Sequence, residues 1–167
     1  MSLNEVVVVS GVRTAVGDFG GSLKDISPAE LGAAVVAEAV KRAGVDAASI
    51  GHCAIGNVIH TEPQDMYMSR VVALNGGLHH HTPAVTVNRL CGSGLQAIVT
   101  AAQQIQLGIC DAAVGGGVES MSRSSYIATG ARFGIRMGDS GNLSRLWFYG
   151  KLSAGVALFG PRRLSVD

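Results

Sequence analysis

Short apolar runs alternate along the chain with longer stretches in which apolar residues recur every three or four positions. The short runs predict strands at residues 6–10, 53–59, 84–87 and 112–114. The longer stretches predict helices at residues 28–43, 64–74 and 92–107. Strands that alternate with helices indicate an α/β fold with a mainly parallel sheet.

The first predicted helix carries clear boundary signals. Ser27 can cap its start, Pro28 suits the first helical position, and Glu30 completes a capping box. Gly44 stands where a C-terminal cap is expected. The helix boundaries therefore follow from local chemistry.

Burial can be predicted for two further elements. The run 6–10 is continuous and β-branched, which is typical of a strand covered on both faces. The helix at 92–107 has little polar surface, so we expect it to be buried. The fourth strand, 112–114, runs directly into the glycine stretch 115–117.

Composition excludes several classes of protein. A length of 167 residues suits one domain, and 47% hydrophobic residues supply a core. The net charge of +1 gives no global argument for nucleic acid or an anionic membrane. Three cysteines at unrelated spacings do not make a disulfide framework, so we expect a reduced, cytoplasmic setting. We see no signal peptide and no run long enough to span a membrane.

The character of the chain changes near residue 141. Residues 141–167 hold four basic residues against one acidic residue, and four of the eight aromatic residues. Neither helical nor strand periodicity is clear there. A basic, aromatic tail could bind nucleic acid or a membrane, but we favour a poorly folding segment.

Cys91 is the main candidate for chemistry. It lies between the strand 84–87 and the helix 92–107, where backbone N–H groups lack intrahelical partners and the helix dipole is positive. Both effects favour the thiolate, which is the reactive form. Gly92 and Gly94 leave room for a substrate carbonyl. We interpret Cys91 as a nucleophile that forms a thioester.

The other candidates are weaker. Cys53 and Cys110 have no special setting and suit small buried hydrophobes. The histidines are His52, His60 and the run 79–81, which precedes Thr82-Pro83 in an expected exposed loop. Adjacent positions in an extended segment point apart, so we expect neither a metal site nor a catalytic triad.

Several motifs together resemble the thiolase family. The segment 87–98, Val-Asn-Arg-Leu-Cys-Gly-Ser-Gly-Leu-Gln-Ala-Ile, resembles the nucleophile segment of thiolases, and 115–122 resembles the glycine-rich segment that follows it. Residues 11–17 and 137–139 match in order and spacing, and 60–67 looks closest to bacterial β-ketothiolases of broad chain length, which are associated with polyhydroxyalkanoate precursors. The resemblance implies a thiolase-like N-terminal half-domain over residues 1–140, with a divergent tail at 141–167. We interpret that tail as translation out of frame.

The resemblance also implies a mechanism. Cys91 would take an acyl group from acyl-CoA, and its backbone N–H would donate to the oxyanion. Deprotonated acetyl-CoA would then attack this thioester and give 3-ketoacyl-CoA, with thiolysis as the reverse reaction. Coenzyme A thioesters are the implied substrates; no cofactor or metal is implied, and the cofactor-binding residues are unknown.

The same resemblance implies that parts of the machinery lie in a C-terminal half that this chain lacks. These are a histidine from a Gly-His-Pro segment, a second cysteine and an asparagine. The chain would therefore be an acyltransferase by ancestry, with negligible condensation alone. It would also expose the apolar helix 92–107, and residues 123–139 lie where the family has its oligomer-forming loop, so a homo-oligomer is implied.

Other interpretations stay open. The chain could be an inactive truncated remnant, or a subunit that works only beside a partner carrying the other half. A related condensing enzyme that uses an acyl-carrier protein shares the cysteine but fits residues 119–122 less well. A cysteine-dependent hydrolase of an unrelated fold is a further alternative.

Overall fold

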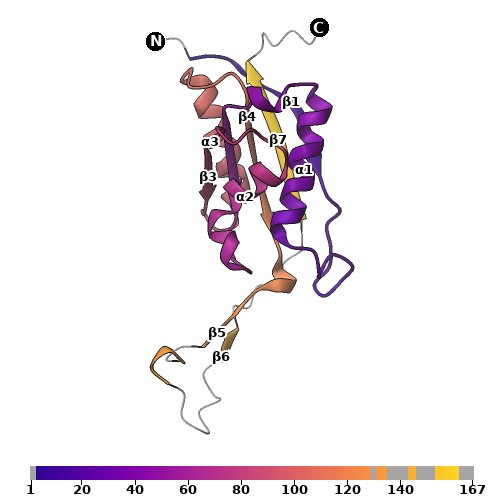
Figure 1. The fold of residues 1–167 in the computed structure, drawn as a ribbon, viewed down its shortest axis with the longest axis vertical. Helices are drawn as coiled ribbons and strands as arrows, with labels where there is room; N and C mark the ends of the chain where they lie inside the picture. The colour runs from indigo at the N-terminus through magenta and orange to yellow at the C-terminus, as the bar shows by residue number, and fades with distance from the viewer. Residues whose placement is uncertain (1–2, 129–130, 135–142, 146–152, 162–167) are drawn as a thin grey trace.

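The computed structural model describes residues 3–128, 131–134, 143–145 and 153–161. Its centre is a five-stranded sheet in the order β1-β7-β4-β2-β3 (Figure 1). These strands are β1 (Val6–Arg13), β2 (His52–Gly56), β3 (Ala84–Val87), β4 (Ala113–Glu119) and β7 (Ser153–Pro161). The strand β7 runs antiparallel to both neighbours, whereas β4, β2 and β3 are mutually parallel. The expected mixed, mainly parallel sheet is confirmed.

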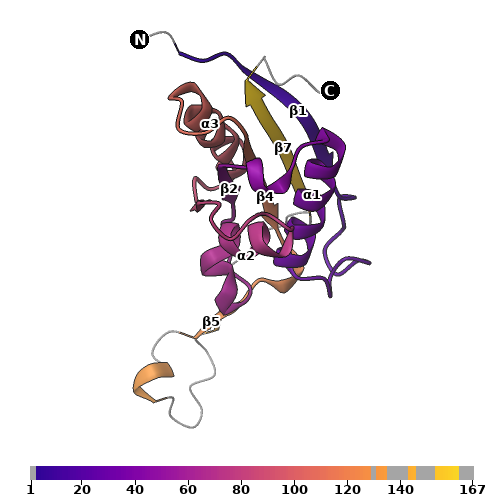
Figure 2. The same cartoon turned by 45° about the horizontal axis from the view of Figure 1, so that its top comes forward.

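Helices cover both faces of the sheet. On one face α1 (Pro28–Ala43) packs beside α2 (Met68–Asn75), and on the other α3 (Ser93–Gln106) lies over β4 and β2 (Figures 1 and 2). The residues buried beneath α1 and α2 form a larger apolar cluster than those beneath α3. The sheet therefore has one broad core and one narrow core.

Short elements complete the described chain. Four 3₁₀ turns are η1 (Ala47–Ser49), η2 (Pro63–Tyr67), η3 (Met121–Arg123) and η4 (Ala131–Phe133). A two-stranded ribbon joins β5 (Tyr126–Ala128) and β6 (Leu143–Arg145). The ribbon extends away from the main sheet beyond the end of β4 (Figure 1).

The predicted caps of α1 are confirmed. The Ser27 hydroxyl accepts a hydrogen bond from the Glu30 amide, and the Glu30 carboxylate accepts from the Ser27 amide. Gly44 ends the helix in the left-handed conformation with φ of 67°. Because these contacts span at most three residues, they could be predicted from sequence.

Four predicted boundaries were wrong. The strand β1 continues to Arg13 instead of ending at residue 10, because pairing with β7 runs that far. The strand β2 ends at Gly56 instead of residue 59, because the amides that follow it turn toward a carboxylate described below. The helix predicted at 64–74 is a 3₁₀ turn followed by α2, and buried Asp65 accepts hydrogen bonds from the Thr61 and Glu62 amides at its start. The glycines 115–117 lie within β4, not after it.

Two predictions of burial need correction. The strand β1 lies at the sheet edge and Val8 is 63% exposed, so β1 is not covered on both faces. The helix α3 buries Ala97, Ala101 and Ile105 but leaves Leu95 68% exposed. It is buried on one face only, because no described element packs on its outer face (Figure 2).

The segment that we expected to fold poorly contributes a central strand. The strand β7 pairs with β1 on one side and β4 on the other. Phe159 is buried among the residues under α3, and Val156 joins the core under α1. Because β7 pairs on both edges, it belongs to the sheet even though its sequence shows no clear strand periodicity. The other aromatic residues of the tail, 147–149, lie outside the described residues. The domain boundary at 140 and the frame-shift interpretation stay predictions, which DNA sequencing beyond codon 140 can test.

Candidate active site

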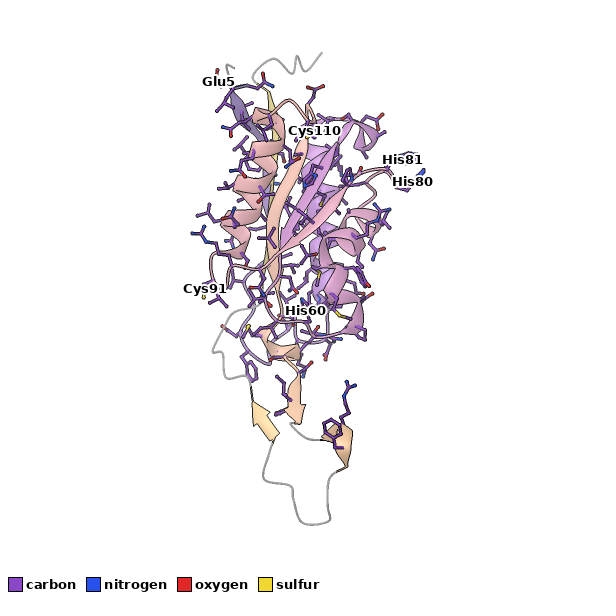
Figure 3. The ribbon with its side chains drawn as sticks, turned by 90° about the vertical axis from the view of Figure 1, so that its left-hand side faces the viewer. Glu5, His60, His80, His81, Cys91 and Cys110 are labelled. Carbon is purple, nitrogen blue, oxygen red and sulfur yellow. The ribbon has the colours of Figure 1, made fainter. Side chains whose placement is uncertain are left out.

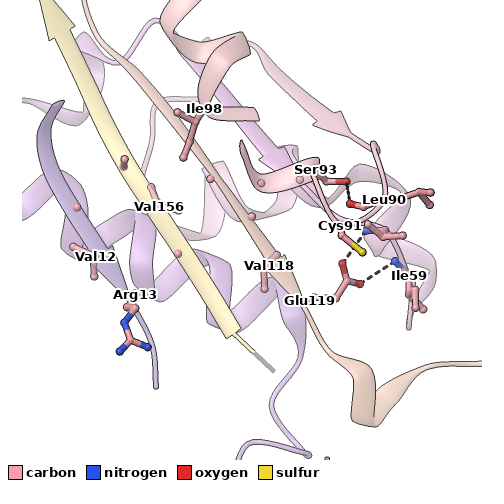
Figure 4. A pocket seen from close by; sticks show the side chains of 18 of the residues that line it. Val12, Arg13, Ile59, Leu90, Cys91, Ser93, Ile98, Val118, Glu119 and Val156 are labelled. Atoms are coloured by element: carbon pink, nitrogen blue, oxygen red, sulfur yellow. Dashed lines mark hydrogen bonds between the residues drawn. The ribbon is translucent and has the colours of Figure 1, made fainter. Parts of the chain in front are cut away.

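A cavity of about 880 Å³ lies where β1, β2 and β4 end and α3 begins (Figure 4). The carboxyl ends of parallel strands in an open α/β sheet are the usual place for a ligand. Apolar groups and backbone form most of the cavity lining, and the polar side chains in it include Arg13, Cys91, Ser93 and Glu119. This cavity is the candidate active site.

Cys91 lines the cavity and is exposed. It lies two residues before the first residue of α3, whose N-terminus has no side-chain cap. The Gly92 and Ser93 amides at the helix start donate to the Arg89 and Leu90 carbonyls, and the helix dipole favours an anionic group beside the sulfur. The predicted position of Cys91, between β3 and α3, is confirmed. Its role as nucleophile and the role of its backbone N–H stay predictions.

The residue before Cys91 is strained. Leu90 has a φ of 50° and is the one non-glycine residue with positive φ among those described. The Asn88 side-chain oxygen accepts from the Leu90 amide at 3.1 Å, and the Ser93 hydroxyl donates to the Leu90 carbonyl at 2.6 Å. Such conformations cost free energy and persist where the surroundings hold them. Here the hydrogen bonds of Asn88 and Ser93 hold the segment that carries the Cys91 sulfur.

Glycines in two strands let the start of α3 approach the sheet. A Cβ atom on Gly56 would lie 2.5 Å from the Ser93 carbonyl carbon, and one on Gly117 would lie 3.0 Å from the Gly94 Cα atom. A larger residue at either position would push the helix away. The glycine stretch in β4 therefore serves packing against α3, and it sets the distance between Cys91 and the sheet.

Glu119, the last residue of β4, holds the loop that follows β2. Its carboxylate accepts hydrogen bonds from the Val58 amide at 3.0 Å and the Ile59 amide at 2.9 Å. Burial raises the pKa of Glu119, and the two amide hydrogen bonds partly oppose that shift. Our sequence interpretation did not single out this residue. The available signal was a lone carboxylate at the end of a glycine-rich strand.

The remaining thiols differ from Cys91. All three cysteines are free. Cys53 is buried, and desolvation raises the pKa of its thiol to about 11. Burial also raises the pKa of Cys110, and nearby Asp111 adds to the shift. The expectation of small buried hydrophobes is confirmed for Cys53, while Cys110 is partly exposed.

The histidine run adopts a different geometry from the one expected. A turn closed by the Thr82 amide and the His79 carbonyl brings the exposed rings of residues 79–81 together, with ligand atoms within 4.8 Å of one another. The prediction that they point apart was wrong, because the segment turns instead of extending. The run lies far from Cys91 along the molecule (Figure 3). No histidine in the described part of the chain lines the cavity.

Comparison with known proteins defines the family. The model of the thiolase N-terminal domain matches residues 6–149, so the chain belongs to the thiolase family. It is 67% identical over 137 residues to the β-ketothiolase BktB of Cupriavidus necator, covering 82% of this chain and 35% of that protein. It is 43% identical over 138 residues to an acetyl-CoA acetyltransferase of the same organism, covering 83% of this chain and 35% of that one.

Solved structures agree with this assignment. The acetyl-CoA acetyltransferase of Bacillus anthracis superposes with a TM-score of 0.79 at 39% identity, over 85% of this chain and 36% of the other. Human mitochondrial 3-ketoacyl-CoA thiolase in complex with CoA gives 0.78 at 35% identity, over 86% and 36%. The chain thus spans about a third of the length of these relatives. Within the described residues, no helix is long and apolar enough to cross a membrane.

Proposed function

We propose that this chain carries the acyl-accepting half of a thiolase site. The Cys91 sulfur attacks the carbonyl carbon of an acyl-CoA, the carbon–sulfur bond to coenzyme A breaks, and the released thiolate takes up the proton lost by Cys91. The product is an acyl thioester on Cys91. The observation that carries the proposal is the exposed Cys91 sulfur at the uncapped start of α3, beside a largely apolar cavity.

The surroundings of Cys91 support acyl-CoA as the substrate class. The cavity lining is mostly apolar, which suits an acyl chain, and Arg13 at the end of β1 adds a cation for an anionic group of coenzyme A. Relatives of this chain bear the names acetyl-CoA acetyltransferase and β-ketothiolase. For the complete enzyme we propose the formation or cleavage of 3-ketoacyl-CoA in the cytoplasm. We propose that this enzyme is a homo-oligomer that needs no cofactor.

Mass spectrometry of the intact protein tests the proposal. After incubation with acetyl-CoA we expect the wild type to gain the mass of one acetyl group and Cys91→Ser to gain none. Cys53→Ala is the matched control, because buried Cys53 stays a neutral thiol and its removal leaves labelling unchanged. Absence of label from folded wild type, or label on Cys91→Ser, would contradict the assignment.

A partner-dependent subunit is the second candidate function. The exposed apolar residues of α3 and its flanks favour it: Leu90, Leu95, Val99, Leu107 and Ile109. Exposed apolar side chains that gather into a patch mark sites of association, and Leu95 and Val99 lie one helical turn apart on α3. Kinetics of acetoacetyl-CoA formation by the isolated chain test this candidate, since we expect negligible condensation unless a partner supplies the missing groups. Sustained turnover by the chain alone would exclude a partner-dependent subunit.

A further inference from the structure

We propose that Glu119 is a positioning residue that, through Val58 and Asn88, holds the Leu90–Cys91 segment in its strained conformation. The inference rests on the proposed role of Cys91 and extends it to a residue 28 positions further along the chain. Glu119 lies on β4, whereas the segment that it would hold lies between β3 and α3.

The first step of the path links β4 to the loop after β2. Glu119 Oε2 accepts from the Val58 amide and Oε1 from the Ile59 amide, so both carboxylate oxygens are engaged. The Asn57 side chain, fully buried, donates to the Val118 carbonyl at 3.0 Å and to Glu119 Oε1 at 3.5 Å. One partly buried carboxylate therefore accepts from two adjacent backbone amides, and hydrogen bonds to a charged acceptor are the stronger kind.

The second step links that loop to the nucleophile segment. The Asn88 side-chain nitrogen donates to the Val58 carbonyl at 3.5 Å. The Asn88 oxygen accepts from the Leu90 amide at 3.1 Å. The same peptide region that Glu119 holds therefore orients Asn88, and Asn88 in turn holds the strained Leu90 next to Cys91.

The geometry explains why a carboxylate is used. Two N–H donors converge on one side chain, and only an ionised carboxyl group accepts at both oxygens without presenting a donor of its own. In Figure 4 the Glu119 carboxylate points toward Ile59, whose amide donates to it. An amide or a protonated carboxyl group would place a donor against one of the two amides.

The rate at which iodoacetamide alkylates Cys91, read by peptide mapping, tests the inference. We expect Glu119→Gln to slow alkylation about two- to five-fold. This range corresponds to a weaker interaction between the Cys91 thiolate and the N-terminus of α3 once the segment shifts. Glu119→Asp, which keeps the charge on a shorter chain, should recover part of the rate. Glu38→Gln is the matched control, because this partly exposed residue of α1 pairs with Arg42 on the helix surface.

The pH dependence separates positioning from a general loss of structure. Burial raises the pKa of Glu119, and the other ionisable groups around it are His60 and Asp65 of the neighbouring loop and Arg13 and Cys91 of the cavity. As pH falls, wild-type Glu119 becomes protonated and one of its two acceptor oxygens becomes a donor, as in glutamine, so the ratio of wild-type to Glu119→Gln rates should approach one. A ratio independent of pH overturns the inference.

Asn88→Ala tests the same path from its other end. Asn88 is exposed, so its removal should leave the fold intact and slow alkylation in the same direction even if Glu119 variants fail to fold. Wild-type rates in both Glu119→Gln and Asn88→Ala overturn the inference while Cys91 stays reactive. An unreactive Cys91 in the folded wild type overturns the proposed function itself.

Discussion

The two faces of the sheet differ in what covers them. Beneath α1 and α2, large side chains such as Val36, Met68 and Val72 are fully buried. Beneath α3 the contacts are made by small residues, chiefly Ala97, Ala101 and the glycines of β4, and the outer side of α3 is exposed. One face supplies most of the apolar burial, whereas the other brings a helix start close to the strand ends and forms the cavity.

The difference teaches how stability and chemistry are divided in this chain. Large interlocking side chains exclude solvent and stabilise the fold, but they leave no space for a ligand. Small residues give up buried area and let backbone approach backbone, which places Cys91 at the cavity. Because α3 is the one described helix that packs on this face, its apolar outer side stays exposed.

The largest expected effect comes from removing the strand that both faces share. A chain that ends at residue 152 lacks β7, so β1 loses its sheet partner and β4 gains an open edge. We expect loss of cooperative thermal unfolding, measured by circular dichroism, together with aggregation of the exposed strand edge. A cooperative transition equal to that of the full chain would show that residues 153–161 are dispensable, as the out-of-frame interpretation of the tail implies.

Truncation of matched apolar side chains compares the two faces directly. Met68→Ala removes a fully buried side chain of α2 and should lower the free energy of unfolding by about 2–5 kcal/mol. Leu95→Ala removes a side chain that is 68% exposed on α3, so its effect should stay within about 0.5 kcal/mol. Urea denaturation measures both. Similar losses for the two variants would mean that the outer side of α3 is covered in solution.

A methyl group added at the contact between α3 and the sheet should have a smaller effect. Gly56→Ala forces a Cβ against the Ser93 and Gly94 backbone, and we expect a loss of about 1–3 kcal/mol and slower alkylation of Cys91. The control is Gly11→Ala, which lines the same cavity but whose added Cβ meets no atom within 4 Å. Equal stability and equal alkylation rates in the two variants would contradict the role of this close contact.

Elements defined by neighbouring residues could be predicted from sequence. The caps of α1, the strand at 84–87 and the position of Cys91 before α3 all agree with the structure. The family could be identified too, because the nucleophile segment and the glycine-rich segment are short and specific. Two turns of the chain were misjudged at 64–74 and 79–81, where hydrogen bonds to Asp65 and across the histidine turn set the backbone.

Contacts between distant residues could not be predicted. The place of β7 between β1 and β4, and the edge position of β1, depend on which strands pair, and that is decided by the assembled sheet. The role of Glu119 depends on amides about sixty residues away. No periodicity or local motif encodes such pairings.

The sequence by itself determined the presence and order of β1, α1, β2, α2, β3, α3 and β4, the family, and the position of the cysteine that the proposed chemistry would use. These follow from propensity, capping and motif, which act over a few neighbouring residues. Only the tertiary structure decided that one face of the sheet is closed and the other open, that glycines bring α3 to the strand ends, and that Glu119 reaches the loop beside Cys91. Those features depend on the packing of segments far apart in the chain, where shape and hydrogen-bond geometry are set together.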